Sequence, residues 1–182
     1  MLLKGAEGQR ITVPACFGCN NGSSEDDEQL RNYISAEVGG NTSASRDMWK
    51  EGGLKSFKRN NKLRNIFLDT TREVEVKDAS GKRQTRIAFE LPVNLYDRVL
   101  SKIAKGLFFY HTGRVFPSSV KRRIDSLVDR PIELEELAYN NICDGAFNYW
   151  YLIEGSSSIW FIEIHSGHWA MVTTGVFCDV AS

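Results

Sequence analysis

Two cysteines near the start of the chain have the spacing of a metal-binding or redox pair. Cys16 and Cys19 flank a tight turn that contains Gly18, so both thiols can reach one metal ion or form one disulfide. Asn20 follows directly, and a short polar run then leads to an acidic stretch that starts at Glu25. Acidic residues are favourable in the first turn of a helix. The pattern therefore predicts a cysteine knuckle followed by a helix that ends at the Gly39-Gly40 pair.

This cysteine pair does not complete a zinc site by itself. A structural zinc ion takes four nitrogen or sulfur ligands, and the pair supplies two. We expect no cofactor, with Cys16 and Cys19 as free thiols or as a disulfide. Zinc is the alternative, with the missing ligands coming from Cys143 and Cys178, from His165 and His168, or from a second copy of the chain. The two histidines flank a short turn, which is typical of surface residues, and the two later cysteines have the character of buried structural residues.

Length and composition indicate an ordinary globular protein. The chain has 182 residues, enough for one sizeable core. We expect a single domain, with the knuckle and its helix in residues 1–40 and a body of helices and antiparallel sheet in 41–182. Basic and acidic residues both number 23, so only a local cluster of charge can indicate a nucleic-acid partner. No apolar run has the length of a membrane span and no secretion signal precedes the knuckle, so we expect a cytoplasmic protein with no membrane partner.

Residues 46–64 contain such a local cluster. Seven basic and two acidic residues give this segment a net charge of +5. Its apolar residues favour one or two helices broken near Gly52-Gly53. The charges suit contacts with phosphates, and the same pattern fits an amphipathic helix whose charged face is only solvated. The residues that we assign to nucleic-acid or partner binding are Lys50, Lys55, Lys58, Arg59, Lys62 and Arg64.

The rest of the chain predicts an α+β fold. Apolar residues recur at helical spacing over 95–111, and His111 in the last turn fits a cation or donor near the helix carbonyls rather than a catalytic group. Two shorter helices are expected at 118–128 and 132–139. Alternating or β-branched and aromatic stretches predict strands near 72–77, 84–90, 146–153, 159–165 and 169–176, the first two as a hairpin and the last three as a meander. We expect the 95–111 helix to pack across one antiparallel sheet of these strands.

The segment from Val13 to Glu28 resembles the second half of the site in a bacterial branch of the HNH endonuclease family. Members of that branch carry an earlier Cys-x-x-Cys and a Glu-His-Val/Ile-Pro stretch, then a Thr-Val-Pro-Ala-Cys-x-x-Cys-Asn segment and a Ser-x-Asp-Glu helix. The stretch 102–109 and the pair Gly113-Arg114 are also similar to a downstream helix of such proteins. Carried over by position, the resemblance implies a zinc half-site at Cys16 and Cys19, with Asn20 as a remnant of the motif.

The part of this sequence that resembles the family does not contain the histidine that performs the chemistry. Nothing before Cys16 supplies the first Cys-x-x-Cys or the Glu-His pair. In the ββα-metal site that histidine activates water, and neighbouring side chains hold the divalent metal ion. Either the sequence is part of a longer protein, or the chain descends from a nuclease and has lost its chemistry. We assign no catalytic residue and expect that this chain alone does not cut DNA.

These observations leave three possible functions for the chain. The resemblance implies a non-catalytic, HNH-derived binding protein that holds nucleic acid or a protein effector. By analogy with mobile elements, inhibition of a defence nuclease, as anti-CRISPR proteins do, is one such function. The alternative is an active HNH-type endonuclease whose metal site is completed by a second chain or an upstream segment, and metal-dependent cleavage distinguishes it from the first. The third is an oligomeric interaction module, a homodimer included, that uses exposed rings of Trp150, Trp160 and Trp169.

Overall fold

Four helices and two antiparallel sheets make up the described part of the computed structural model, which covers residues 11–15, 24–38, 46–47, 49–77, 80–132, 134–143, 145–165 and 167–178. The helices are α2 (Ser24–Val38), α4 (Leu54–Arg59), α5 (Asn61–Asp69) and α6 (Val93–Thr112), with short helical turns η1 (Trp49–Gly53) and η2 (Gly175–Cys178). The strands are β1 (Arg72–Lys77), β2 (Arg83–Ala88), β3 (Arg122–Leu127), β4 (Ala138–Ile142), β5 (Phe147–Glu154), β6 (Ser157–Ile164) and β7 (His168–Thr174). Among these residues, no helix combines the length and the apolar composition needed to cross a bilayer.

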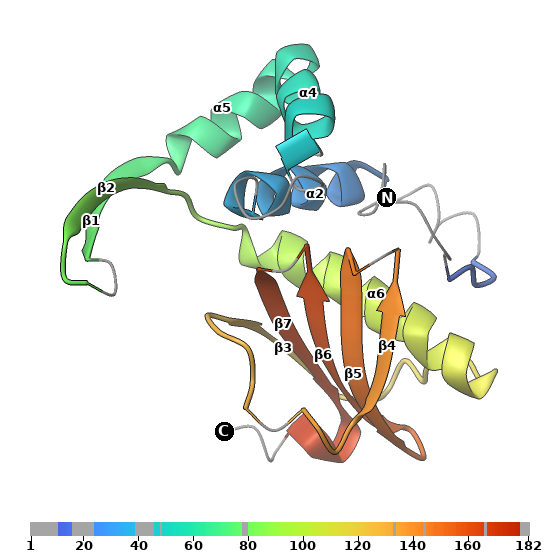
Figure 1. Cartoon of the computed structure of the whole chain (residues 1–182). Helices are drawn as coiled ribbons and strands as arrows, with labels where there is room; N and C mark the ends of the chain where they lie inside the picture. Colours follow the sequence, from blue (N-terminus) through green and yellow to red (C-terminus); the bar gives the residue numbers. More distant parts are fainter. Residues whose placement is uncertain are drawn as a thin grey trace.

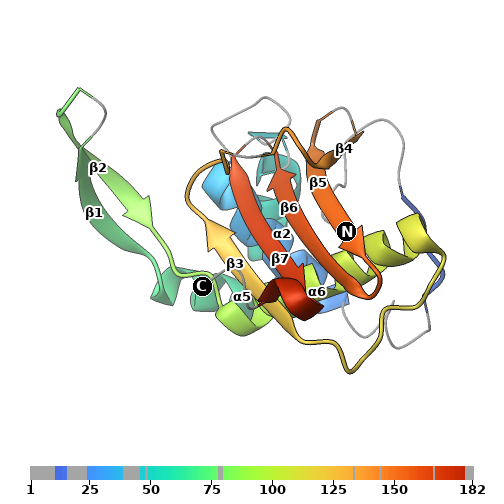
Figure 2. The ribbon, with the colours of Figure 1, turned by 90° about the horizontal axis from the view of Figure 1, so that it is seen from below.

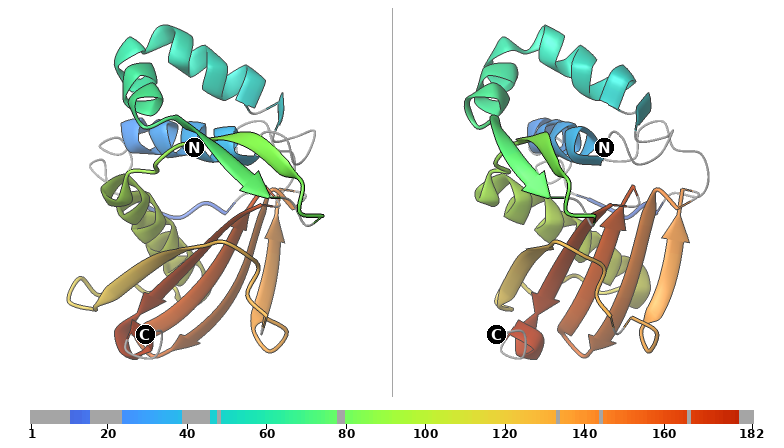
Figure 3. Two further views of the ribbon diagram at one scale, coloured as in Figure 1. Left: turned by 90° about the vertical axis from the view of Figure 1, so that its left-hand side faces the viewer. Right: turned by 60° about the vertical axis from the view of Figure 1, so that its left-hand side comes forward.

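The larger sheet is the base on which the other elements rest. Its five strands run in the order β3-β7-β6-β5-β4, and every neighbouring pair is antiparallel. Helix α6 lies across one face of this sheet, and α2 lies beside α6 on the side toward α4 and α5 (Figure 1; Figure 3). The expected α+β class is therefore confirmed.

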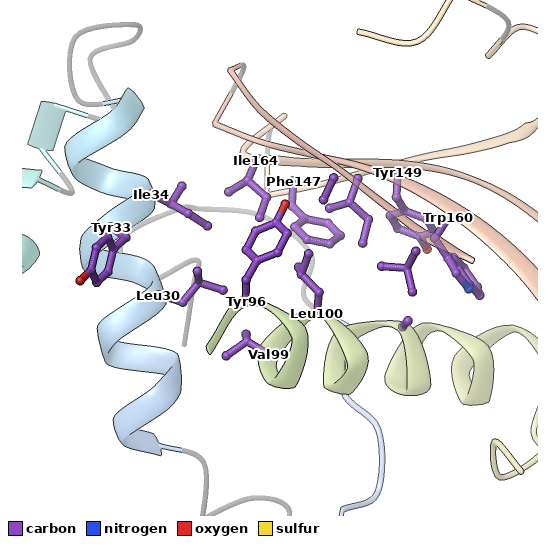
Figure 4. Packing of buried hydrophobic residues seen from close by; sticks show 14 of the residues in the cluster. Leu30, Tyr33, Ile34, Tyr96, Val99, Leu100, Phe147, Tyr149, Trp160 and Ile164 are labelled. Atoms are coloured by element: carbon purple, nitrogen blue, oxygen red, sulfur yellow. The ribbon is translucent and has the colours of Figure 1, made fainter. Parts of the chain in front are cut away.

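The core lies between α6 and the sheet. Alternate residues of the central strand β6 point to this side, and Trp160, Ile162 and Ile164 are fully buried there. Residues of α6 meet them, with Leu100 completely buried, as Figure 4 shows. The predicted packing of this helix is confirmed, since Leu100, Ile103, Leu107 and Phe108 all belong to or pack against the buried cluster. Leu30, Tyr33 and Ile34 of α2 extend the same cluster toward α5.

Two of the predicted helices are wrong. Residues 118–128 contain strand β3, and the described residues of 134–137 form a turn that leads into strand β4 at Ala138. These are the two edge strands of the sheet, so each has one neighbouring strand, and both contain adjacent polar residues, Arg122-Arg123 in β3 and Asn140-Asn141 in β4. Their polar composition hides the alternation of a strand, and Pro131 resembles the first residue of a helix.

The predicted hairpin is confirmed, but its predicted place in the sheet is wrong. Strands β1 and β2 pair only with each other in the described structure and form a separate two-stranded sheet. Figures 1 and 2 show this ribbon extending away from the other elements. None of its twelve strand residues is buried, so the ribbon contributes no layer to the core.

Candidate nucleic-acid interface

The basic segment folds into two short helices that meet at a sharp break. Helix α4 ends at Arg59, and the side chain of Asn60 then accepts a hydrogen bond from the backbone nitrogen of Leu63 at 3.0 Å. This is the usual capping bond at the start of a helix, and it begins α5 one residue later. The predicted break at Gly52-Gly53 is present as the turn η1 before α4. The second break, at Asn60, is not predicted by the charge or apolar pattern.

Aromatic packing holds the inner side of both helices. Phe57 of α4 and Phe67 of α5 are buried, with ring centroids 5.0 Å apart. Phe67 also packs on Tyr33 of α2 at 5.3 Å and on Phe89 beyond β2 at 4.9 Å. Because the rings face inward, the charged residues between them are left on the outer side.

A buried polar contact fixes α4 against α2. The hydroxyl of Ser56 donates a 2.8 Å hydrogen bond to Glu28 and accepts another, also 2.8 Å, from the side-chain nitrogen of Asn32. Asn32 is completely buried and Ser56 nearly so. Losing one partner of such a bond costs the desolvation of the other, so these residues set the angle at which α4 lies. The sequence gives no indication of this contact, because its members are 24 and 28 residues apart.

All six residues assigned to binding are exposed. Lys55 is neutralised in part, since it forms an ion pair with Glu51 and thereby lowers the pKa of that carboxyl group. Within the described part of the chain, the other five form no ion pair and no side-chain hydrogen bond: Lys50 in η1, and Lys58, Arg59, Lys62 and Arg64 in α4 and α5. The structure therefore brings four uncompensated cations onto two consecutive short helices.

Some of the candidate zinc ligands lie outside the described residues, and the others are buried. Cys16, Cys19 and Asn20 lie outside the described residues. Cys143 and Cys178 are buried, and the thiol of Cys178 lies 3.4 Å from the carbonyl oxygen of Thr173. Among the residues that the structure describes, no group of three or more histidine, cysteine, aspartate or glutamate side chains is arranged to hold a metal ion.

His165 and His168 are not surface residues, contrary to the prediction from the sequence. His165 is 4% exposed and His168 is 2% exposed. Nδ1 of His168 lies 2.7 Å from a carboxylate oxygen of Glu37, and Nε2 lies 3.0 Å from the hydroxyl of Tyr96. Both ring nitrogens are thus occupied, so His168 joins α2 and α6 to β7 and could bind a metal only after giving up one of these bonds.

His111 also differs from its expected role at the end of α6. Its Nε2 lies 2.9 Å from the hydroxyl of Tyr149, and its ring stacks on Tyr151 with centroids 4.2 Å apart. Burial lowers the pKa of His111 below its usual value, because removing water disfavours the charged imidazolium. The ring therefore packs as a neutral aromatic group and not as a terminal cation.

The tryptophans expected at an interaction surface lie mostly inside the protein. Trp160 is fully buried and Trp169 is 6% exposed. Trp150 is half-buried and stacks on Trp169 at 5.4 Å. The exposed rings that the third function requires are absent at Trp160 and Trp169.

Comparison of this chain with protein-family models, with curated proteins and with solved structures finds no match. The α+β fold and the basic surface of α4 and α5 are therefore the observations from which function is argued.

Proposed function

We propose that this chain is a non-catalytic binding protein, related to HNH nucleases, that holds nucleic acid on the outer surface of α4 and α5. One observation carries the proposal: Lys58, Arg59, Lys62 and Arg64 are exposed on consecutive short helices and form no ion pair within the described residues. Phosphate oxygens are the natural acceptors for such cations, and binding releases counterions from the nucleic acid.

Two physical arguments favour a ligand over simple solvation. First, like charges on neighbouring turns repel one another in the free protein, and phosphate groups relieve that repulsion. Second, the helices that carry the cations are positioned by the buried contacts of Phe57, Phe67 and Ser56. A fixed array loses less conformational freedom on binding than a set of charges on a mobile segment.

The test reverses charge at the centre of the surface. Lys58→Glu with Arg59→Glu should weaken binding to a 20-base-pair duplex, measured by fluorescence anisotropy over a series of salt concentrations. For each phosphate that the variant no longer neutralises, the slope of log K against log salt should fall by about 0.9. The matched control is Lys105→Glu with Arg122→Glu, which makes the same charge change at exposed positions of α6 and β3.

The control distinguishes an effect of the α4 and α5 surface on affinity from an effect of the protein's net charge. Equal weakening by the two pairs of substitutions would mean that overall charge, and not α4 and α5, governs the affinity. If the parent protein binds neither duplex nor single strands at low salt, the nucleic-acid function is refuted and a protein effector remains.

A further inference from the structure

The β1–β2 ribbon has no role in the core, although its strands are regular. All twelve strand residues are exposed or half-buried, and Ile87 is 67% exposed. A two-stranded ribbon alone is only marginally stable in water. It follows α5 directly, because α5 ends at Asp69 and β1 begins at Arg72. The ribbon therefore projects from the same part of the molecule as the basic helices (Figure 1; Figure 2).

The register of the ribbon separates its charges between two faces. Arg72 is opposite Ala88, Val74 is opposite Arg86, and Val76 is opposite Gln84. Because side chains alternate along a strand, these six residues share one side, which we call the arginine face. The other side, the mixed face, consists of Glu73, Glu75, Lys77, Arg83, Thr85 and Ile87.

The two faces differ in their suitability for an anionic partner. The arginine face has two arginines and no acidic residue. The mixed face has two glutamates, and Glu75 there forms an ion pair with Arg83 at 3.3 Å. Arg72 meets Glu90, just beyond β2, at 3.4 Å, but both side chains are 66% exposed, so water and phosphate compete with that pair. Only the arginine face is complementary to a polyanion.

We propose that the arginine face lies in the major groove of duplex DNA and contacts base edges through Arg86 and Gln84. This inference rests on the nucleic-acid function proposed for α4 and α5 and adds the form of the ligand. The major groove of B-DNA is about 12 Å wide and admits a two-stranded ribbon. Strands of this length span about 20 Å, enough to follow the groove over several base pairs.

The side chains of the arginine face match the groove chemically. Arginine donates two hydrogen bonds to O6 and N7 of guanine, and glutamine pairs with N6 and N7 of adenine. In the free protein, Nη2 of Arg86 donates a 2.9 Å hydrogen bond to Oε1 of Gln84. This bond holds the two side chains together on the ribbon, and it uses only one of the five N–H donors of the Arg86 guanidinium.

The experiment compares the two faces with matched substitutions. Arg86→Ala with Gln84→Ala should lower the affinity for a 20-base-pair DNA duplex by about tenfold, the loss expected for base contacts. Arg83→Ala with Thr85→Ala removes the same charge from the mixed face and should change the affinity by about twofold or less. Dimethyl sulfate methylates guanine N7 in the major groove. We expect the parent and the mixed-face variant to protect N7, and the arginine-face variant to lose that protection.

The outcomes distinguish this inference from the proposed function. Equal effects of the two variants, or binding without N7 protection, would overturn the major-groove placement while leaving the basic surface of α4 and α5 intact. Binding to an RNA duplex as tightly as to DNA would also overturn it, because the major groove of RNA is too deep and narrow for side chains to read. A parent protein that binds single strands but no duplex would overturn the major-groove placement alone, and one that binds neither would refute both proposals.

Discussion

His111 shows how one half-buried side chain makes stability depend on pH. In the unfolded chain the imidazole titrates near its ordinary value of about 6.5, whereas burial lowers its pKa in the folded protein. The unfolded state therefore binds more protons than the folded state between these two pKa values, and linkage makes the folded state less stable as the pH falls. The cost is absent above the unfolded pKa and increases as the pH falls toward the folded pKa.

Replacing His111 should remove this dependence. We expect His111→Gln, which can keep a hydrogen bond to the Tyr149 hydroxyl but cannot titrate, to show a flatter loss of unfolding free energy between pH 7 and pH 5 than the parent. Urea denaturation at each pH measures the unfolding free energy of both proteins. Asp26, whose pKa is lowered by its hydrogen bond to Arg98, titrates below this window and does not interfere. Parallel curves for parent and variant would show that His111 is not the group responsible.

At the scale of elements, the acidic first turn of α2 also binds helix α6. Asp26 accepts two hydrogen bonds from Arg98 of α6, at 2.7 and 2.8 Å, and Asp27 forms an ion pair with Lys102 one turn further. Acids in this turn are favourable for the helix by themselves. Here they also bind α6, so residues that the sequence assigns to helix initiation help to hold two helices together.

The turn after β7 depends on a glycine for a steric reason. Gly175 has a φ of 63°, and a methyl group there would collide with the side chain of Ser157 and lie 3.2 Å from its Cα. Gly155 has a φ of 62° but nothing within 4 Å of the corresponding position. Gly155→Ala should therefore cost only the left-handed backbone penalty, about 1–2 kcal/mol. Gly175→Ala should cost about 1–3 kcal/mol more, because the collision adds to that penalty.

Chemical denaturation of these two glycine variants measures the difference. The Gly155 variant is the control, because it pays the same backbone cost without the collision. Equal losses would show that Ser157 moves aside and that the turn is not sterically closed.

For the whole molecule, the core and the ribbon should respond differently to the loss of an apolar side chain. Leu100 is fully buried between α6 and the sheet, whereas Ile87 on the ribbon is 67% exposed. We expect Leu100→Ala to lower the unfolding free energy by about 2–5 kcal/mol and Ile87→Ala to change it by less than about 0.5 kcal/mol. Thermal unfolding of both variants measures this. A large loss from Ile87→Ala would indicate that the ribbon packs against something in solution.

The sequence by itself determined the elements whose pattern is local. The sequence predicts, to within a few residues, the helices Ser24–Val38 and Val93–Thr112, the hairpin and the last three strands. It does so because an apolar stripe or an alternation is a property of neighbouring residues in the sequence. The exposure of Lys58 and Arg59 follows from the same pattern, since charged residues take the outer side of an amphipathic helix.

Only the tertiary structure decided which elements meet. β3 and β4 are strands because β7 and β5 provide their hydrogen-bond partners, and no stretch of neighbouring residues carries that information. His168 is buried because Glu37 and Tyr96 lie beside it, 131 and 72 residues away in the chain. The ribbon stays outside the sheet for the complementary reason: it alternates like a strand of a sheet, but within the described residues its two strands pair only with each other and none of their side chains is buried. Burial and pairing are properties of distant contacts, so they appear only once the chain is folded.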